Sequence, residues 1–68
     1  MIHKTAIIDK KAKISDNVKI GPYCIVGPEV QIGSNSVLHS HVNIVGNTQI
    51  GKNNQIYPFS SIGTPPQD

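Results

Sequence analysis

A branched aliphatic residue occupies every sixth position of this chain from its second residue onward. The series consists of Ile2, Ile8, Ile14, Ile20, Val26, Ile32, Leu38, Ile44, Ile50, Ile56 and Ile62. An amphipathic helix repeats its apolar positions about every 3.6 residues, so this period does not fit a helix. Because six is a multiple of two, the pattern instead predicts short strands that turn one face inward. Small or slim residues stand two positions earlier on the same face: Ala6, Ala12, Val18, Cys24, Val30, Ser36, Val42, Thr48, Asn54 and Ser60.

Glycine and asparagine recur at fixed positions between the aliphatic residues. Glycine directly follows the aliphatic at positions 21, 27, 33, 51 and 63, and asparagine stands three after it at positions 17, 35, 47 and 53. Both residues tolerate a positive φ, so both columns predict turns with left-handed backbone. Pro22, Pro28 and Pro58 are predicted at corners, because proline has no amide to donate to a strand ladder.

A strand and a turn in every six residues predict an all-β fold, a parallel β-helix built from hexapeptides. Three strands would close a triangular coil of eighteen residues, and neighbouring coils would lie about 4.8 Å apart. Residues 1–63 would form about three and a half coils as a single domain. The aliphatic residues then stack in three columns that need no aromatic side chains: Ile2, Ile20, Leu38 and Ile56; Ile8, Val26, Ile44 and Ile62; Ile14, Ile32 and Ile50.

The repeat stops near the end of the chain, where the next aliphatic position is Asp68. A lone carboxylate in an aliphatic core carries a large desolvation cost, and Pro65 and Pro66 remove two ladder donors in succession. We therefore expect residues 64–68 to begin a loop that leaves the coil, a place where function is often found. Because an uncapped final coil would expose apolar surface and unpaired strand edges, we expect an N-terminal piece of a longer protein or a covering chain.

Composition narrows the function classes. The net charge is only +2, from six lysines against four acidic residues, and the chain has no arginine, which argues against nucleic-acid binding. The single cysteine excludes an intramolecular disulfide. No apolar run approaches the length of a membrane span, and Met1 is not followed by a signal-peptide core. A cytoplasmic protein is the resulting expectation.

Several side chains could bind a metal or act in catalysis, but for each of them a structural role is the commoner explanation. His39 and His41 are predicted to lie two apart on one strand, where they could chelate a metal, whereas His3 and His39 would lie about 10 Å apart. Zinc motifs such as CxxC and HExxH are absent, so surface or subunit-contact histidines are favoured over a metal site. Cys24 lies in the slim column without a neighbouring base and is predicted to be a small buried residue.

Exposed residues offer two further alternatives. Four lysines could steer an acidic protein, but a solvated face is the commoner explanation: Lys10, Lys11, Lys13 and Lys19. Tyr57 and Phe59 point outward in the pattern, which favours packing against a partner subunit or the following loop over ligand stacking.

Four segments of the chain carry a family resemblance: IGPYCIVGPEVQIG at 20–33, VLHSHV at 37–42, and IYPFSSIG at 56–63 followed by PQD at 66–68. They resemble the N-terminal coils of the acyl-[acyl-carrier-protein]–UDP-N-acetylglucosamine O-acyltransferase family. The opening HKTAII is similar to the start of that family, with Lys4 in place of a proline. The hexapeptide pattern is shared by many acyltransferases, whereas the segment from position 56 to the end is more specific.

The resemblance implies a left-handed coil, although ordinary parallel crossovers are right-handed. It also implies the first acylation step of lipid A biosynthesis, in which an (R)-3-hydroxyacyl group moves from acyl carrier protein to the 3-hydroxyl of UDP-N-acetylglucosamine. Members of the family are homotrimers with sites between neighbouring prisms, and they need no metal or cofactor.

Residue roles follow from the resemblance position by position. The general base is a histidine in a later coil, so this chain contains no catalytic residue and is expected to be inactive alone. Gln67 and Asp68 match the substrate-binding pair, and an aspartate there can accept hydrogen bonds from sugar hydroxyls. His41 matches a position that we expect to contact the neighbouring subunit.

Two other function classes stay open. Another hexapeptide acyl- or acetyltransferase would differ in the loop after Ile62. A non-catalytic β-helix module, such as an ice-binding solenoid, would need a ladder of threonines, whereas Thr5, Thr48 and Thr64 lie in different columns.

Overall fold

The computed structural model describes residues 1–63 and contains ten strands of two residues each. They are β1 (Ile7–Ile8), β2 (Lys13–Ile14), β3 (Lys19–Ile20), β4 (Ile25–Val26), β5 (Gln31–Ile32), β6 (Val37–Leu38), β7 (Asn43–Ile44), β8 (Gln49–Ile50), β9 (Gln55–Ile56) and β10 (Ser61–Ile62). In every strand the second residue is the aliphatic of the six-residue repeat. It is less exposed than the residue before it, as the alternation of strand side chains requires.

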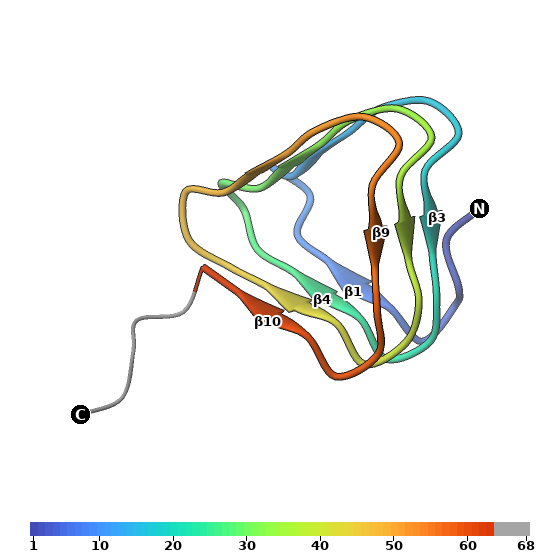
Figure 1. Cartoon of the computed structure of the whole chain (residues 1–68). Helices are drawn as coiled ribbons and strands as arrows, with labels where there is room; N and C mark the ends of the chain where they lie inside the picture. Colours follow the sequence, from blue (N-terminus) through green and yellow to red (C-terminus); the bar gives the residue numbers. More distant parts are fainter. Residues whose placement is uncertain (64–68) are drawn as a thin grey trace.

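The strands form three parallel sheets, in the orders β1-β4-β7-β10, β2-β5-β8 and β3-β6-β9. Each residue pairs with the residue eighteen positions later, so that Ile8 lies beside Val26 and Val26 beside Ile44. The three sheets are the sides of a triangle in Figure 1. The predicted eighteen-residue coil and its three aliphatic columns are therefore confirmed.

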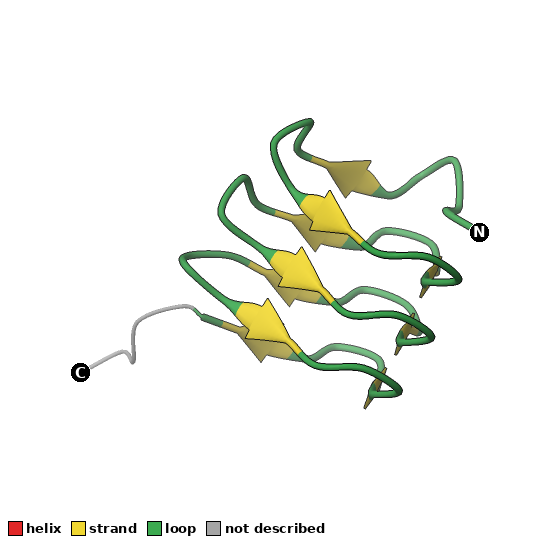
Figure 2. Ribbon diagram, turned by 90° about the horizontal axis from the view of Figure 1, so that it is seen from above, coloured by secondary structure: helices red, strands yellow, loops and turns green. Residues whose placement is uncertain are grey.

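The coil is left-handed. In Figure 1 the view runs along the axis with the last coil nearest, and the chain passes clockwise from β9 to β10. Figure 2 shows the coils stacked in sequence order from the N-terminal end. A chain that turns clockwise while it approaches the viewer is left-handed, which is the exception that the family resemblance implies.

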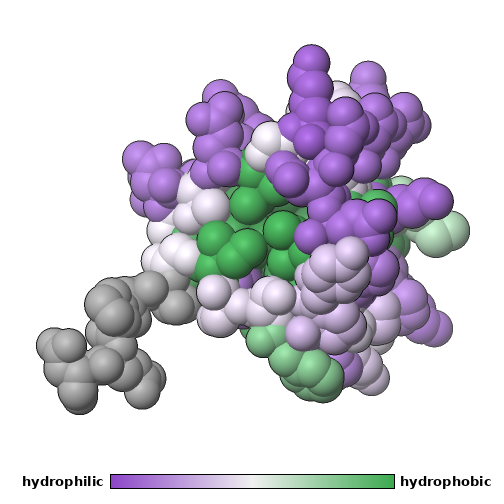
Figure 3. Space-filling view, viewed as in Figure 1, coloured by the Kyte–Doolittle hydropathy of each residue, from purple (hydrophilic) through white to green (hydrophobic). Residues whose placement is uncertain are grey.

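The core is a stack of aliphatic layers that is deepest in the middle coils. The side chains with less than 2% exposure are Cys24, Val26, Val30, Ile32, Ser36, Leu38, Val42 and Ile44. At the two ends of the coil, Ile8, Ile14, Ile56 and Ile62 are only partly buried against this core. Figure 3 shows apolar residues at the centre of the end nearest the viewer, with hydrophilic side chains above them and to their right. Cys24 is the small buried residue that the sequence predicted.

The asparagine turns are confirmed at one corner of the triangle. Asn17, Asn35 and Asn53 have φ values of 60°, 63° and 58°. Their left-handed backbone lets the ladder continue around the corner, because the amide of Asn35 donates to Asp16 O (3.2 Å) and that of Asn53 to Ser34 O (2.9 Å). Asn47 does not adopt a positive φ, so the prediction is wrong at this one position.

The glycine column needs a correction, since only Gly63 of its five members has the predicted positive φ. The other members adopt ordinary φ, and two of them are required by close packing between coils. A Cβ on Gly33 would lie 2.7 Å from the carbonyl carbon of Gly51, and one on Gly21 would collide with the carbonyl oxygen of His39. Glycine at these two positions therefore sets the distance between coils rather than the shape of the turn.

Ser36 is a polar side chain inside the core, and it is fully satisfied. Its hydroxyl donates to Gly51 O (2.8 Å) and accepts from the amide of Asn54 (3.2 Å), which joins the second asparagine turn to the third. The serine thus ties two coils together where an aliphatic side chain could not.

Ser36→Ala is expected to lower the free energy of unfolding by about 1–2 kcal/mol, because both backbone partners lose a hydrogen bond. Urea denaturation followed by circular dichroism measures the loss. Ser15→Ala changes an exposed serine and is the control, expected to keep the wild-type midpoint. Equal midpoints for the two variants would contradict the role assigned to Ser36.

Candidate functional site

One corner of the triangle gathers nearly all the rings of the chain. This aromatic corner consists of residues 21–24, 39–42 and 57–60 and leads into the sheet β1-β4-β7-β10; in Figure 1 it lies at the bottom, between β9 and β10. Tyr23, His41 and Phe59 follow one another at the coil period, and their rings form a ladder along the axis. The ring centroids of Tyr23 and His41 are 5.1 Å apart, and those of His41 and Phe59 are 4.9 Å apart.

The ladder residues all have left-handed backbone, with φ values of 59° for Tyr23, 53° for His41 and 64° for Phe59. The amides of His41 and Phe59 donate to Pro22 O (3.0 Å) and Ser40 O (3.3 Å) of the preceding coil. The amide of Tyr23 does not donate to a carbonyl of the first coil. It donates instead to the hydroxyl of Thr5 in that coil (3.0 Å).

This backbone is costly for bulky side chains. A left-handed conformation costs a residue other than glycine or asparagine roughly 1–2 kcal/mol. The chain meets the same need with Asn17, Asn35 and Asn53 at the neighbouring corner. Strained residues of this kind concentrate at functional positions, so the three rings mark this corner as a candidate site.

A second, shorter column lies beside the ladder. The ring of His39 stacks on Tyr57, with centroids 5.2 Å apart and ring planes 8° apart, and its Nε2 lies 3.1 Å from Gln55 Oε1. His39 and His41 therefore contact different neighbours. Both histidines lie in the corner between β6 and β7, so the prediction that they share a strand and chelate a metal from it is wrong.

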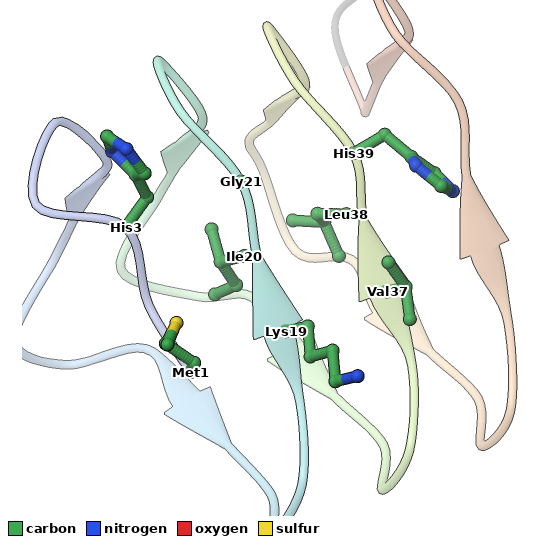
Figure 4. A pocket seen from close by; sticks show the side chains of 8 residues that line it. All are labelled: Met1, His3, Lys19, Ile20, Gly21, Val37, Leu38 and His39. Atoms are coloured by element: carbon green, nitrogen blue, oxygen red, sulfur yellow. The ribbon is translucent and has the colours of Figure 1, made fainter.

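His3 is separated from His39 by Gly21, which contributes no side chain to their column. A hollow of about 410 Å³ opens there, lined by Met1, His3, Lys19, Ile20, Gly21, Val37, Leu38 and His39. In Figure 4 the two histidine side chains diverge on either side of it. His3 Nδ1 is hydrogen-bonded to the Thr5 hydroxyl (2.9 Å). Within residues 1–63, no three histidine, cysteine or acidic side chains lie close enough together to hold a metal ion.

The predicted basic residues lie on the surface, where Lys10, Lys11, Lys13 and Lys19 are all exposed. This agrees with the solvated-face interpretation. No helix in the described part of the chain is long and apolar enough to cross a membrane.

The predicted substrate-binding residues, Gln67 and Asp68, lie outside the residues that the structure describes, as does the predicted loop at 64–68. His41 lies in the middle of the ladder, an exposed position that a second subunit could reach. Sequence reasoning missed the ladder itself. The available signal was that Tyr23, His41 and Phe59 stand eighteen residues apart in the column that elsewhere holds asparagine.

Comparison with known proteins decides the family. Residues 11–46 match the bacterial transferase hexapeptide family (six repeats). The chain belongs to this family. Its resemblance to one branch of these hexapeptide transferases is also confirmed: an acyl-[acyl-carrier-protein]–UDP-N-acetylglucosamine O-acyltransferase of Rickettsia typhi is 62% identical over 97% of this chain and 25% of the relative.

Two solved hexapeptide transferases show the same coil. The UDP-N-acetylglucosamine O-acyltransferase of Moraxella catarrhalis is 63% identical, with a TM-score of 0.93 over 98% of this chain and 26% of that protein. The UDP-N-acetylglucosamine acyltransferase of Francisella novicida is 50% identical, with a TM-score of 0.94 over 100% of this chain and 25% of that protein. The chain thus spans about a quarter of the length of the relatives it matches.

Proposed function

We propose that this chain is the N-terminal part of an O-acyltransferase of lipid A biosynthesis. The complete enzyme would move an (R)-3-hydroxyacyl group from acyl carrier protein to the 3-hydroxyl of UDP-N-acetylglucosamine. One observation carries the proposal: 62% identity over 97% of the chain with a relative named for those two substrates. The eleven aliphatic positions of the repeat are a sixth of the 68 residues, so shared coil architecture alone does not account for that identity.

In this proposal the described coils act as a rigid platform, and the chemistry takes place beyond them. Gln67 and Asp68 follow the last coil and hold the sugar, with the Asp68 carboxylate accepting hydrogen bonds from its hydroxyls. The general base that takes the proton of the 3-hydroxyl comes from a later coil, and no metal or cofactor is required. His41 contacts the neighbouring subunit of a homotrimer. Both substrates are water-soluble, which agrees with a cytoplasmic enzyme.

A chimera tests the activity. Residues 1–68 would replace the matching quarter of the Moraxella catarrhalis enzyme, and transfer from acyl-[acyl-carrier-protein] to UDP-N-acetylglucosamine would be measured. The chimera is expected to keep kcat/KM within about tenfold of the parent, since the coil is nearly superimposable. A chimera that folds but transfers no acyl group would refute the proposal.

Asp68→Asn in the same chimera tests the sugar contact. Loss of charge-assisted hydrogen bonds worth about 1.5–3 kcal/mol is expected to lower kcat/KM by roughly tenfold to a hundredfold. Asp16→Asn is the matched control, because Asp16 is an exposed aspartate of the described coils to which the proposal gives no role. If the two variants had equal kcat/KM, Asp68 would have no part in the site.

A further inference from the structure

The hollow beside Gly21 lies in a column of rings that lacks one member. Positions 3, 21, 39 and 57 follow one another at the coil period, and they hold His3, Gly21, His39 and Tyr57. His39 and Tyr57 stack with their centroids 5.2 Å apart, which is close to one coil spacing. His3 and His39 are two coils apart, or about 10 Å, which leaves room for one further ring at the level of Gly21. In Figure 4 Gly21 lies on the coil between the two histidines.

The chain itself cannot supply the missing ring. A Cβ on Gly21 would run into the carbonyl oxygen of His39 and lie 2.7 Å from the carbonyl carbon. The backbone is held in place there, because the amide of Gly21 donates to Leu38 O (2.8 Å). The hollow is therefore built into the spacing of the coils. Its volume of about 410 Å³ falls in the range of small-molecule sites.

The surfaces of the hollow suit a flat apolar ligand. Its floor is the outer side of β3 and β6, where the backbone is paired in a parallel ladder, and Met1 and Val37 border it with apolar side chains. The imidazole of His39 borders it as well. Tyr57 covers the face of this imidazole toward the following coil, so the opposite face is turned toward the level of Gly21. An aromatic ring can stack on that face at the separation of roughly 4.5–7 Å that ring pairs prefer.

The charge at the hollow favours an anion. Lys19 is exposed, and it is the one lysine among the lining residues, which include no aspartate or glutamate. A carboxylate on the ligand would pair with the Lys19 ammonium, whereas a cation would be repelled. One lysine matches one negative charge. A nucleoside diphosphate carries more charge and is normally held by a helix N-terminus or a nest of amides, and the paired backbone of the floor offers no such nest.

We propose that this hollow binds a small planar aromatic carboxylate. The ring of the ligand completes the column by stacking on His39, and its carboxylate pairs with the ammonium of Lys19 at the rim. The proposed acyl transfer gives this site no role, and the inference does not depend on it.

A titration of the nitrogen-15-labelled chain with naphthoate, a two-ring aromatic carboxylate, tests the proposal. A dispersed amide correlation spectrum shows that the chain is folded, and the signals of Ile20, Gly21 and His39 are expected to shift together. For a ligand of about thirteen non-hydrogen atoms the expected Kd is on the order of 1 mM. Two analogues serve as ligand controls. Naphthamide lacks the charge and decahydronaphthoate lacks the flat rings, so each should bind about threefold more weakly or worse.

Two pairs of variants locate the binding. Val37→Trp fills the hollow with a side chain that strands accept well, and it is expected to abolish the shifts. Gln31→Trp places the same ring at the equivalent outward position of β5 and should bind naphthoate like the wild-type chain. Lys19→Gln is expected to weaken naphthoate binding about two- to fivefold and to leave naphthamide binding unchanged. Lys13→Gln, at the equivalent outward position of β2, should change neither.

Ligand-detected saturation transfer to the acyl-transfer chimera, which carries the same coils, repeats the comparison in a complete enzyme. The proposal would be overturned if the folded protein bound no naphthoate at about 10 mM, tenfold above the expected Kd. Binding that Val37→Trp leaves unchanged would also overturn it, as would equal binding of naphthoate and either analogue. Uridine diphosphate is titrated in parallel. Tighter binding of this nucleotide at the same amides would refute the proposal, because the hollow would then belong to a nucleotide site. None of these results depends on acyl transfer by the chimera, so the two proposals can fail separately.

Discussion

Gly21→Ala is expected to lower the free energy of unfolding by about 3 kcal/mol, the upper part of the range for overpacking. The added Cβ would run into the carbonyl oxygen of His39 in the next coil. The atoms that the Cβ would meet, His39 O, His39 C and Leu38 O, all belong to the backbone, so no side chain can rotate away to relieve the clash. The amide of Gly21 also donates to Leu38 O (2.8 Å), so any shift that separates the coils weakens the ladder as well.

Gly27→Ala is the matched control, because Gly27 occupies the same column of the repeat without the close approach. Its added Cβ would lie 3.5 Å from the Cα of Val45, an ordinary contact. This variant is expected to match the wild-type chain or to gain up to about 1 kcal/mol from reduced unfolded-state entropy. Urea denaturation of both variants measures the difference. Equal stability of the two would mean that the coils can separate at Gly21 without cost.

Ile44→Ala is expected to be at least as damaging, with a loss of about 3–4 kcal/mol. Ile44 is completely buried in the third coil, with Val26 before it and Ile62 after it in the same column. Adjacent layers are joined by backbone ladders on every side of the triangle, so the core cannot collapse into the space that is left. A chain of this length has a total stability on the order of 3–10 kcal/mol, so the loss approaches global unfolding.

Ile8→Ala provides the comparison within the same column. Ile8 belongs to the first coil and is only partly buried, so its truncation is expected to cost about 1–2 kcal/mol. Circular dichroism during thermal denaturation distinguishes the two variants. Equal losses at Ile8 and Ile44 would contradict a core whose packing is tightest in the middle coils.

Much of the fold was predictable from the sequence because the coil is a local structure. Each turn contacts only the turn before and the turn after, so the same residue type is required at the same place in every repeat. The spacing of Ile14, Ile32 and Ile50 was therefore enough to predict the strand positions, the register and the coil length. The left hand came from resemblance instead, since the spacing of a repeat is the same for both hands.

The candidate site was less predictable. The three ladder residues, Tyr23, His41 and Phe59, differ in chemical type. No column of identical residues in the repeat therefore indicated that they belong together. Their relation becomes visible only when the eighteen-residue coil brings them to one corner and their rings meet. Histidine chemistry also drew attention to His39 and His41 as a pair, although each of them contacts a ring of another coil.

The sequence by itself determined the β-helix and its aliphatic columns, because these depend on which side chains can fill a core of fixed period. The family came from the resemblance of particular segments. Only the tertiary structure decided the role of Gly21 and Gly33, and it alone revealed the ring ladder with its left-handed backbone. Glycine serves a positive φ and a close backbone approach equally well. Which of the two applies depends on distances between coils, and residue identity carries no information about those distances.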